Sequence, residues 1–190
     1  MEKRNIGRGR EIFWMMRFII IGAPGSGKGT QAELLAKKLR LKHISSNLLR
    51  DEIKKKTRLG KIFERYINRG DLVPDKFVNR LFKRNIPKDN FILDGYPRRV
   101  GEARYIKSVG IDYIIFLDVP KSILKKRLLR RAKIEGRKDD TEKVIEERFR
   151  VYNKETMPLL KYYKNKLIRL DGNRKPEKIL KDIIKIIRRN

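Results

Sequence analysis

One glycine-rich stretch constrains this chain more than any other: residues 22–30, which read Gly-Ala-Pro-Gly-Ser-Gly-Lys-Gly-Thr. It follows an apolar run at residues 18–21 and opens a helical pattern with Leu34, Leu35 and Leu39 on one face. Strand, glycine loop and helix in this order are typical of a phosphate-binding loop. Glycines let successive backbone N–H groups converge on one anion, and the helix N-terminus adds partial positive charge. The alternative is a plain glycine turn between a strand and a helix.

The loop supplies the first candidate site residues. Lys28 is expected to reach the β- and γ-phosphates of a nucleotide as a mobile point charge. Gly29 stands where the general phosphate-loop motif has the Ser or Thr hydroxyl that binds magnesium. The predicted ATP-binding residues of the loop are Gly25, Ser26, Gly27, Lys28, Gly29 and Thr30.

Length and composition predict one folded domain. The chain has 190 residues, enough to bury a sizeable core, and 39% of them are hydrophobic. It has no cysteine and a single histidine, His43, so disulfides, thiolate zinc sites and cysteine nucleophiles are excluded. No apolar run approaches the roughly 20 residues of a membrane span. We interpret residues 1–15 as an N-terminal extension and expect a cytoplasmic protein.

The charge is strongly positive. Lys and Arg total 51 against 23 Asp and Glu, a net charge of +28. Such a field attracts nucleotides, nucleic acids and anionic surfaces alike.

Alternating strand and helix patterns predict an α/β fold with a parallel sheet covered on both faces. We expect Ser46 or Asn47 to cap the helix that follows the second strand. The predicted strands are 17–22, 43–45, 91–94, 113–118 and 167–170, and the predicted helices are 28–40, 47–56, 59–69, 74–84, 99–108, 120–136, 141–164 and 176–189.

Four motifs occur in a characteristic order: 22–31, Leu-Val-Pro-Asp at 72–75, Asp-Gly-Tyr-Pro-Arg at 94–98, and Gly-Arg-Lys-Asp-Asp at 136–140. Together they resemble the adenylate kinase family of nucleoside monophosphate kinases, in which Gly29 is the usual residue of the loop. The resemblance implies the P-loop nucleoside monophosphate kinase fold with a five-stranded parallel sheet. It also implies one kinase domain over 16–190, with a helical monophosphate-binding segment at about 46–74 and a short lid at about 130–140.

The resemblance implies transfer of the γ-phosphoryl group of MgATP to AMP, which gives two ADP. Phosphoryl transfer needs charge neutralisation and in-line positioning, which explains the many arginines among the candidates. By resemblance, the catalytic residues are Lys28, Arg98, Arg137 and Arg148, and Arg127 and Arg131 bind ATP. The AMP-binding residues are Ser46, Arg50, Leu72, Val73, Gly95, Arg98, Glu102, Arg137 and Arg148.

The expected cofactor is Mg²⁺, which Asp94 at the end of an apolar strand would order through water. The alternative for Asp94 is a helix or turn cap. Because only five residues separate Arg131 from Arg137, the lid is of the short type and no zinc is expected. Asp139 and Asp140 are expected to anchor the lid rather than bind metal.

The sequence departs from the family pattern at two places. The segment at 43–50 is one residue shorter than usual and lacks the aspartate that helps to hold the magnesium water shell, with Asn47 in that region. Glu102 stands where the family has the glutamine that reads adenine, and a carboxylate donates to a ring nitrogen only when protonated. Ser46 retains the hydroxyl expected of the adenine-selective branch.

Two other functions stay open on the sequence. One is a kinase of the same fold that acts on UMP or CMP. The other is an RNA- or ribosome-associated nucleotide-binding factor with weak kinase activity, in which basic clusters such as 54–56 would contact RNA phosphates. We prefer solvated helix faces for these clusters, because no aromatic stacking platform interleaves them. A monomer is expected, since moving segments need free surface.

Overall fold

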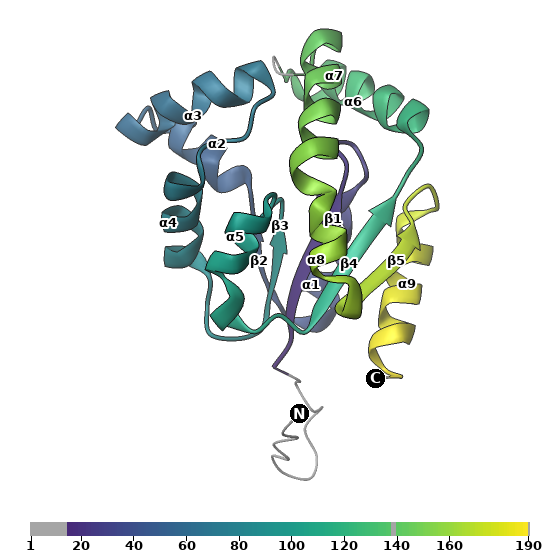
Figure 1. Ribbon diagram of the computed structural model, residues 1–190. Coiled ribbons are helices and arrows are strands. Elements are labelled where there is room, and N and C mark those ends of the chain that lie inside the picture. The colour runs from purple at the N-terminus through teal and green to yellow at the C-terminus, as the bar shows by residue number, and fades with distance from the viewer. Residues whose placement is uncertain (1–14, 138–139, 190) are drawn as a thin grey trace.

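The computed structural model describes residues 15–137 and 140–189, and its centre is a parallel sheet (Figure 1). The strand order is β2-β3-β1-β4-β5, and every neighbouring pair is parallel. The strands are β1 (Arg17–Gly22), β2 (Lys42–Ser45), β3 (Phe91–Asp94), β4 (Tyr113–Asp118) and β5 (Leu167–Asp171). The predicted α/β fold with five parallel strands is therefore confirmed, and each predicted strand boundary agrees within one residue.

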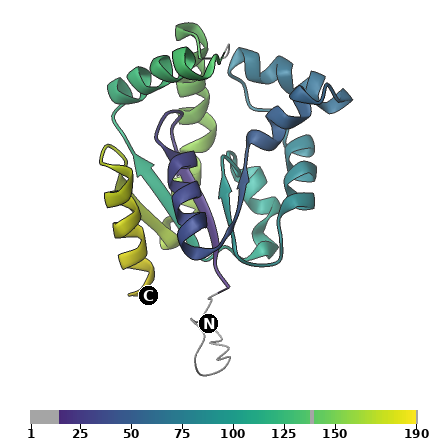
Figure 2. The ribbon, with the colours of Figure 1, turned by 180° about the vertical axis from the view of Figure 1, so that it is seen from behind.

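Helices cover both faces of the sheet and extend above its carboxyl edge (Figures 1 and 2). The α-helices are α1 (Lys28–Leu39), α2 (Asn47–Lys54), α3 (Arg58–Arg69), α4 (Asp75–Asn85), α5 (Val100–Tyr105), α6 (Lys121–Glu135), α7 (Glu142–Val151), α8 (Pro158–Tyr162) and α9 (Pro176–Ile187).

The two faces of β1 show why the layers form. Successive side chains of a strand point to opposite faces, so apolar residues at every position of β1 serve two cores. Phe18 and Ile20 pack with α1 and α9, which Figure 2 shows from behind. Ile19 and Ile21 pack with residues of α4, α5 and α8 on the other face. The continuous apolar run in the sequence therefore corresponds to a strand buried on both sides.

The connections around β1 create the site of the molecule. The chain leaves β1 into α1 on one face, and it leaves the neighbouring β3 toward α5 on the other face. In open parallel sheets, ligands bind at the carboxyl ends of the strands where such connections diverge. The glycine-rich loop after β1 and the Asp94 motif after β3 both lie at this point.

Three helix predictions differ in detail from the structure. The side chain of Ser46 does not cap α2; instead, the Ser45 hydroxyl accepts a hydrogen bond from the Asn47 N–H at 3.2 Å. The helix predicted at 99–108 is α5 followed by a 3₁₀ turn, η1 (Lys107–Val109). The helix predicted at 141–164 is divided into α7, a π-helical turn η2 (Tyr152–Thr156) and α8. Pro158 explains the division, since proline has no N–H and its ring displaces the preceding turn.

The predicted N-terminal extension lies outside the described residues except for Met15, as do Lys138 and Asp139 of the predicted lid. Within the described part of the chain, no helix combines the length and the apolar character that crossing a membrane requires.

Candidate active site

The loop between β1 and α1 has the conformation that its glycines allow. Gly25 and Gly27 have positive φ angles of 83° and 89°, which residues with a side chain rarely adopt. A Cβ on Gly25 would also lie 3.0 Å from the carbonyl oxygen of Leu124 on α6. The loop therefore turns sharply into the N-terminus of α1, as a phosphate-binding loop requires.

Lys28, at the first position of α1, folds back over this loop. Its Nζ donates hydrogen bonds to the carbonyl oxygens of Gly22 and Ala23, both at 2.9 Å. Burial lowers the pKa of Lys28 to about 7, and the charges of Arg98, Arg148 and Arg131 act in the same direction while Asp94 opposes them. An anion placed among these groups would restore the charged form of the lysine.

Asp94 ends β3 and is paired in register with Ile20 of β1 and Ser45 of β2. Its Oδ2 lies 3.5 Å from the Ser45 hydroxyl and 3.6 Å from Nε2 of His43. Burial by itself raises the pKa of Asp94, but the interaction with His43 and the charge of Lys28 outweigh it, so that the net pKa lies below its ordinary value. Asp94 is therefore a charged carboxylate at neutral pH beside the phosphate loop.

Arg98 follows the strand end through a tight turn. Its Nε donates to the carbonyl oxygen of Gly95 at 2.9 Å, and its Nη2 donates to the Ser46 hydroxyl at 3.2 Å. Gly95 has a φ of 75°, and a Cβ there would lie 2.5 Å from Ser46 Oγ, so glycine is needed for this approach. Burial lowers the pKa of Arg98, while Glu102 and Asp94 oppose this effect.

Glu102 is buried on α5 behind Arg98. Its Oε2 accepts a hydrogen bond from the backbone N–H of Arg98 at 2.5 Å. Burial raises the pKa of Glu102, against the hydrogen bond from Arg98, which lowers it. The carboxylate therefore ties the peptide of Arg98 to α5 and lines the cavity described below.

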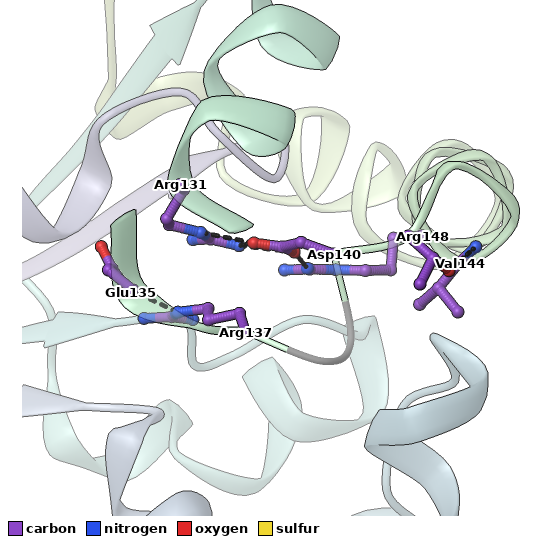
Figure 3. Close-up of polar contacts among 7 residues, drawn as sticks. Arg131, Glu135, Arg137, Asp140, Val144 and Arg148 are labelled. Atoms are coloured by element: carbon purple, nitrogen blue, oxygen red, sulfur yellow. Dashed lines mark hydrogen bonds and ion pairs between the residues drawn. The ribbon is translucent and has the colours of Figure 1, made fainter. Parts of the chain in front are cut away.

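Two arginines of the site share one buried carboxylate (Figure 3). Arg131 on α6 donates to both oxygens of Asp140 at 2.7 and 2.8 Å, and Arg148 on α7 donates to Oδ1 at 2.5 Å. The Asp140 side chain is 0% exposed. One charge thus fixes the position of two guanidinium groups from different helices.

Arg137 and Arg127 are held more loosely. Arg137 pairs at 2.6 Å with Glu135, whose side chain is 47% exposed (Figure 3). Arg127 donates at 3.2 Å to the carbonyl oxygen of Gly172 and to Oδ1 of Asn173. Because an exposed ion pair such as Arg137–Glu135 contributes at most about 1 kcal/mol, a bound phosphate can displace Glu135 at little cost.

The phosphate loop, Asp94, Arg98, Glu102 and the arginines described above line one cavity of about 820 Å³. The structure brings into it every residue that the sequence predicts for the site. From the phosphate loop and the strand ends these are Gly25, Ser26, Gly27, Lys28, Gly29, Thr30, Asp94, Gly95, Arg98 and Glu102, and from the flanking segments they are Ser46, Arg50, Leu72, Val73, Arg127, Arg131, Arg137 and Arg148.

Sequence reasoning missed one buried amide in this cavity. Nε2 of Gln31 donates to the carbonyl oxygen of Pro176 at 2.9 Å and so joins α1 to the start of α9. Its Oε1 is buried and accepts no hydrogen bond from any residue that the structure describes. The signal was its place directly after Thr30, at the end of the motif at 22–31, where the sequence analysis gave it no role.

The donor set fits magnesium held together with a nucleotide. Mg²⁺ keeps several waters and is usually bound through one or two carboxylates and substrate phosphates. Asp94 supplies one charged carboxylate beside the phosphate loop. Over residues 15–137 and 140–189, no group of three His, Cys, Asp or Glu side chains is arranged to hold a metal ion.

Comparisons with known proteins agree with this geometry. Residues 20–168 match the family model described as adenylate kinase. The chain is 42% identical to the adenylate kinase of Prochlorococcus marinus (strain MIT 9301), with 87% of this chain and 94% of the relative aligned. It is 34% identical to that of Petrotoga mobilis (91% and 98%) and 39% identical to that of Encephalitozoon cuniculi (88% and 95%). The resemblance that the four motifs indicate is therefore confirmed, and the chain belongs to the adenylate kinase family of nucleoside monophosphate kinases.

Proposed function

We propose that this chain catalyses the general reaction of its family, transfer of the γ-phosphoryl group of ATP to AMP to give two ADP, at the cavity above the sheet. One observation carries the proposal. Asp94, Arg98, Arg131 and Arg148 line one cavity with the buried amine of Lys28, and their charges act on that amine, although they come from three separate parts of the sequence. Phosphoryl transfer requires such convergence, because its transition state spreads charge over the phosphoryl oxygens.

The donor nucleotide lies along the phosphate loop in this proposal. Backbone N–H groups of residues 25–30 hold its phosphates, and Lys28 leaves the carbonyl oxygens of Gly22 and Ala23 to contact them. Arg127 and Arg131 on α6 lie over ATP. Arg131 needs no rearrangement, since Asp140 already holds it.

The acceptor lies on the α2 and α3 side of the cavity. Arg50, Arg98, Arg137 and Arg148 bind its phosphate, and Ser46, Leu72, Val73, Gly95 and Glu102 surround the rest of it. Guanidinium forks suit phosphate oxygens bidentately. The residues 46–74 would move as the monophosphate-binding segment and about 130–140 as the short lid, whose closure excludes water.

Asp94 would hold Mg²⁺ through water, and when bound the ion neutralises phosphate charge and orients the donor. The shortened segment near Asn47 lacks a second carboxylate, but the Ser45 hydroxyl lies close to Asp94. No zinc is part of the proposal. A monomer in the cytoplasm stays a prediction, which light scattering after size-exclusion chromatography and cell fractionation test.

The experiment is a coupled assay with MgATP and AMP, UMP, CMP or GMP in parallel, repeated without magnesium. We expect rapid, magnesium-dependent ADP formation with AMP. Faster turnover with a pyrimidine monophosphate would overturn AMP as the acceptor and support the UMP/CMP alternative. Failure of all four acceptors to yield ADP would overturn the kinase proposal.

Variants assign the residues in the same assay. Arg148→Gln should reduce kcat by about 100-fold or more, because it removes charge stabilisation of the transferring group. Arg17→Gln is a matched control, since Arg17 also donates to a carboxylate, that of Asp112, but lies at the start of β1 away from the cavity. Equal losses in the two variants would contradict the role of Arg148.

A further inference from the structure

Arg99, directly after the predicted acceptor-binding Arg98, joins two parts of the chain that flank the acceptor side of the cavity. Its Nη1 donates to the carbonyl oxygen of Val73 at 3.1 Å and to Oδ1 of Asp75 at 2.8 Å. Its Nε donates to Oε2 of Glu155 in the π-helical turn at 3.3 Å. The Arg99 side chain is 26% exposed, so these contacts are partly shielded from water.

Arg99 contacts the segment at residues 71–75, which forms a wall of the cavity. Asp71, Leu72 and Val73 line the large cavity, and Asp71 and Leu72 also line a second cavity of about 260 Å³ that Arg99 and Glu155 border from behind. Leu72 therefore borders both cavities. The wall has one further point of close approach at Gly70, where a Cβ would lie 3.1 Å from the carbonyl oxygen of Val144 on α7.

Apolar packing sets the position of Val73, whereas the Arg99 hydrogen bond sets the direction of its carbonyl group. Its side chain is 4% exposed within the apolar core, which decides where the residue lies. The hydrogen bond from Arg99 decides which way the peptide carbonyl points, because side-chain packing does not set the rotation of a peptide plane. That rotation matters at a site wall, because Leu72 and Val73 line the large cavity.

Arg99 also neutralises Asp75 next to the predicted base-reading residue. Asp75 has a close neighbour in Gly101, where a Cβ would lie 2.8 Å from Oδ2. Burial raises the pKa of Glu102, the charge of Asp75 adds to this effect, and Arg99 opposes it. Loss of Arg99 would leave the Asp75 charge without its shortest ion pair, close to Glu102.

We propose that Arg99 is a positioning residue for the acceptor nucleotide: it orients the Val73 peptide and ties the wall at 71–75 to the π-helical turn after α7. This inference rests on the proposed function, since the acceptor is taken to lie against that wall. Arg99 itself does not contact the acceptor. Its effect is selective, because none of its partners belongs to the phosphate loop or to α6.

The test measures AMP and ATP binding separately by isothermal titration calorimetry on the full chain. We expect Arg99→Gln to weaken AMP binding by about tenfold and to leave ATP binding unchanged. Arg99→Lys should show a smaller loss, because one ammonium replaces only part of the guanidinium fork. Glu155→Gln, which removes only the tie to the π-helical turn, should weaken AMP binding by about threefold.

Arg17→Gln is the matched control. Arg17 is 28% exposed, and it too pairs with an aspartate, Asp112, and donates to a backbone carbonyl, that of Val109 at 2.8 Å. It should lose comparable thermal stability without any change in AMP affinity. A purely structural role for Arg99 would give the two variants the same behaviour.

Unchanged AMP affinity in Arg99→Gln, or equal losses for AMP and ATP, would overturn the inference. If Arg99→Gln does not fold, Arg99→Lys and Glu155→Gln test the inference, because each should weaken AMP binding and leave ATP binding unchanged. Turnover by the unsubstituted protein tests the proposed function separately, because calorimetry detects AMP binding whether or not phosphoryl transfer follows.

Discussion

Oδ1 of Asp140 lies 2.5 Å from Nη1 of Arg148, and the Asp140 side chain is completely buried. The same carboxylate accepts two hydrogen bonds from Arg131. Two cations from α6 and α7 are therefore brought to one side of the cavity by a single negative charge before any phosphate arrives (Figure 3). Such preorganisation lowers the reorganisation needed during phosphoryl transfer.

Asp140→Asn should lower the free energy of unfolding by about 3 kcal/mol, because it removes the negative charge that pairs with two partly buried guanidinium groups. It should also reduce kcat, since Arg131 and Arg148 then repel each other. Denaturant unfolding and steady-state kinetics measure the two effects. Glu135→Gln, which removes an exposed pair with Arg137, is the control and should change stability by less than about 1 kcal/mol. Native stability in Asp140→Asn would contradict the argument.

ATP binding should take up protons through Lys28. Its pKa is about 7 in the free protein, so at about pH 8 most of the amine is neutral. Phosphates favour the charged form and raise that pKa, so binding draws in up to about one proton. Calorimetry in buffers of different ionisation enthalpy measures this number. An identical binding enthalpy in all buffers would contradict the prediction.

The lowered pKa of Lys28 has a second consequence for stability. The pKa of Lys28 is lower in the folded protein than in the unfolded chain, so the unfolded chain binds more protons between about pH 7 and pH 10.5. The free-energy cost of burying the charged amine is therefore complete below this range and decreases across it. Lys28→Met should therefore raise the melting temperature more at about pH 6 than at about pH 10. A gain that is equal at both pH values would argue against a buried charged amine.

Glu102 should make acceptor binding depend on pH. Its pKa is raised by burial, so its protonated form, which is able to donate to a ring nitrogen, persists to higher pH than for an ordinary glutamate. We expect KM for AMP to rise as the pH increases above the ordinary titration range of a glutamate, and Glu102→Gln to abolish this slope because its amide donates at every pH. Parallel pH profiles for the two proteins would show that Glu102 does not contact the base.

Gly29 leaves room beside the metal-ordering carboxylate. A Cβ on Gly29 would lie 3.5 Å from Oδ2 of Asp94, an ordinary contact, so Gly29→Ala should fold and retain its magnesium requirement. Gly29→Ser adds a hydroxyl that donates to Asp94 and occupies the lone pairs that would order the metal's water. The magnesium concentration for half-maximal rate should rise about threefold. An unchanged magnesium titration in Gly29→Ser would contradict this use of Asp94.

The sequence by itself determined the sheet, the phosphate loop and the family of this protein. Apolar runs such as 18–21 form strands wherever both faces are covered, and Gly25 and Gly27 adopt φ angles that other residues rarely do. These signals are local, so they can be recognised without knowing the fold. The motif residues also met in one cavity as expected, because the carboxyl ends of parallel strands share one edge.

Only the tertiary structure decided which charged groups pair. The chain has 51 Lys and Arg against 23 Asp and Glu, and composition does not say that Asp140 is buried between Arg131 and Arg148. Nor does it place Arg99 against Val73, 26 positions away. Ion pairing depends on distance and burial, which follow from how helices pack after the chain has folded, and not from spacing along the sequence.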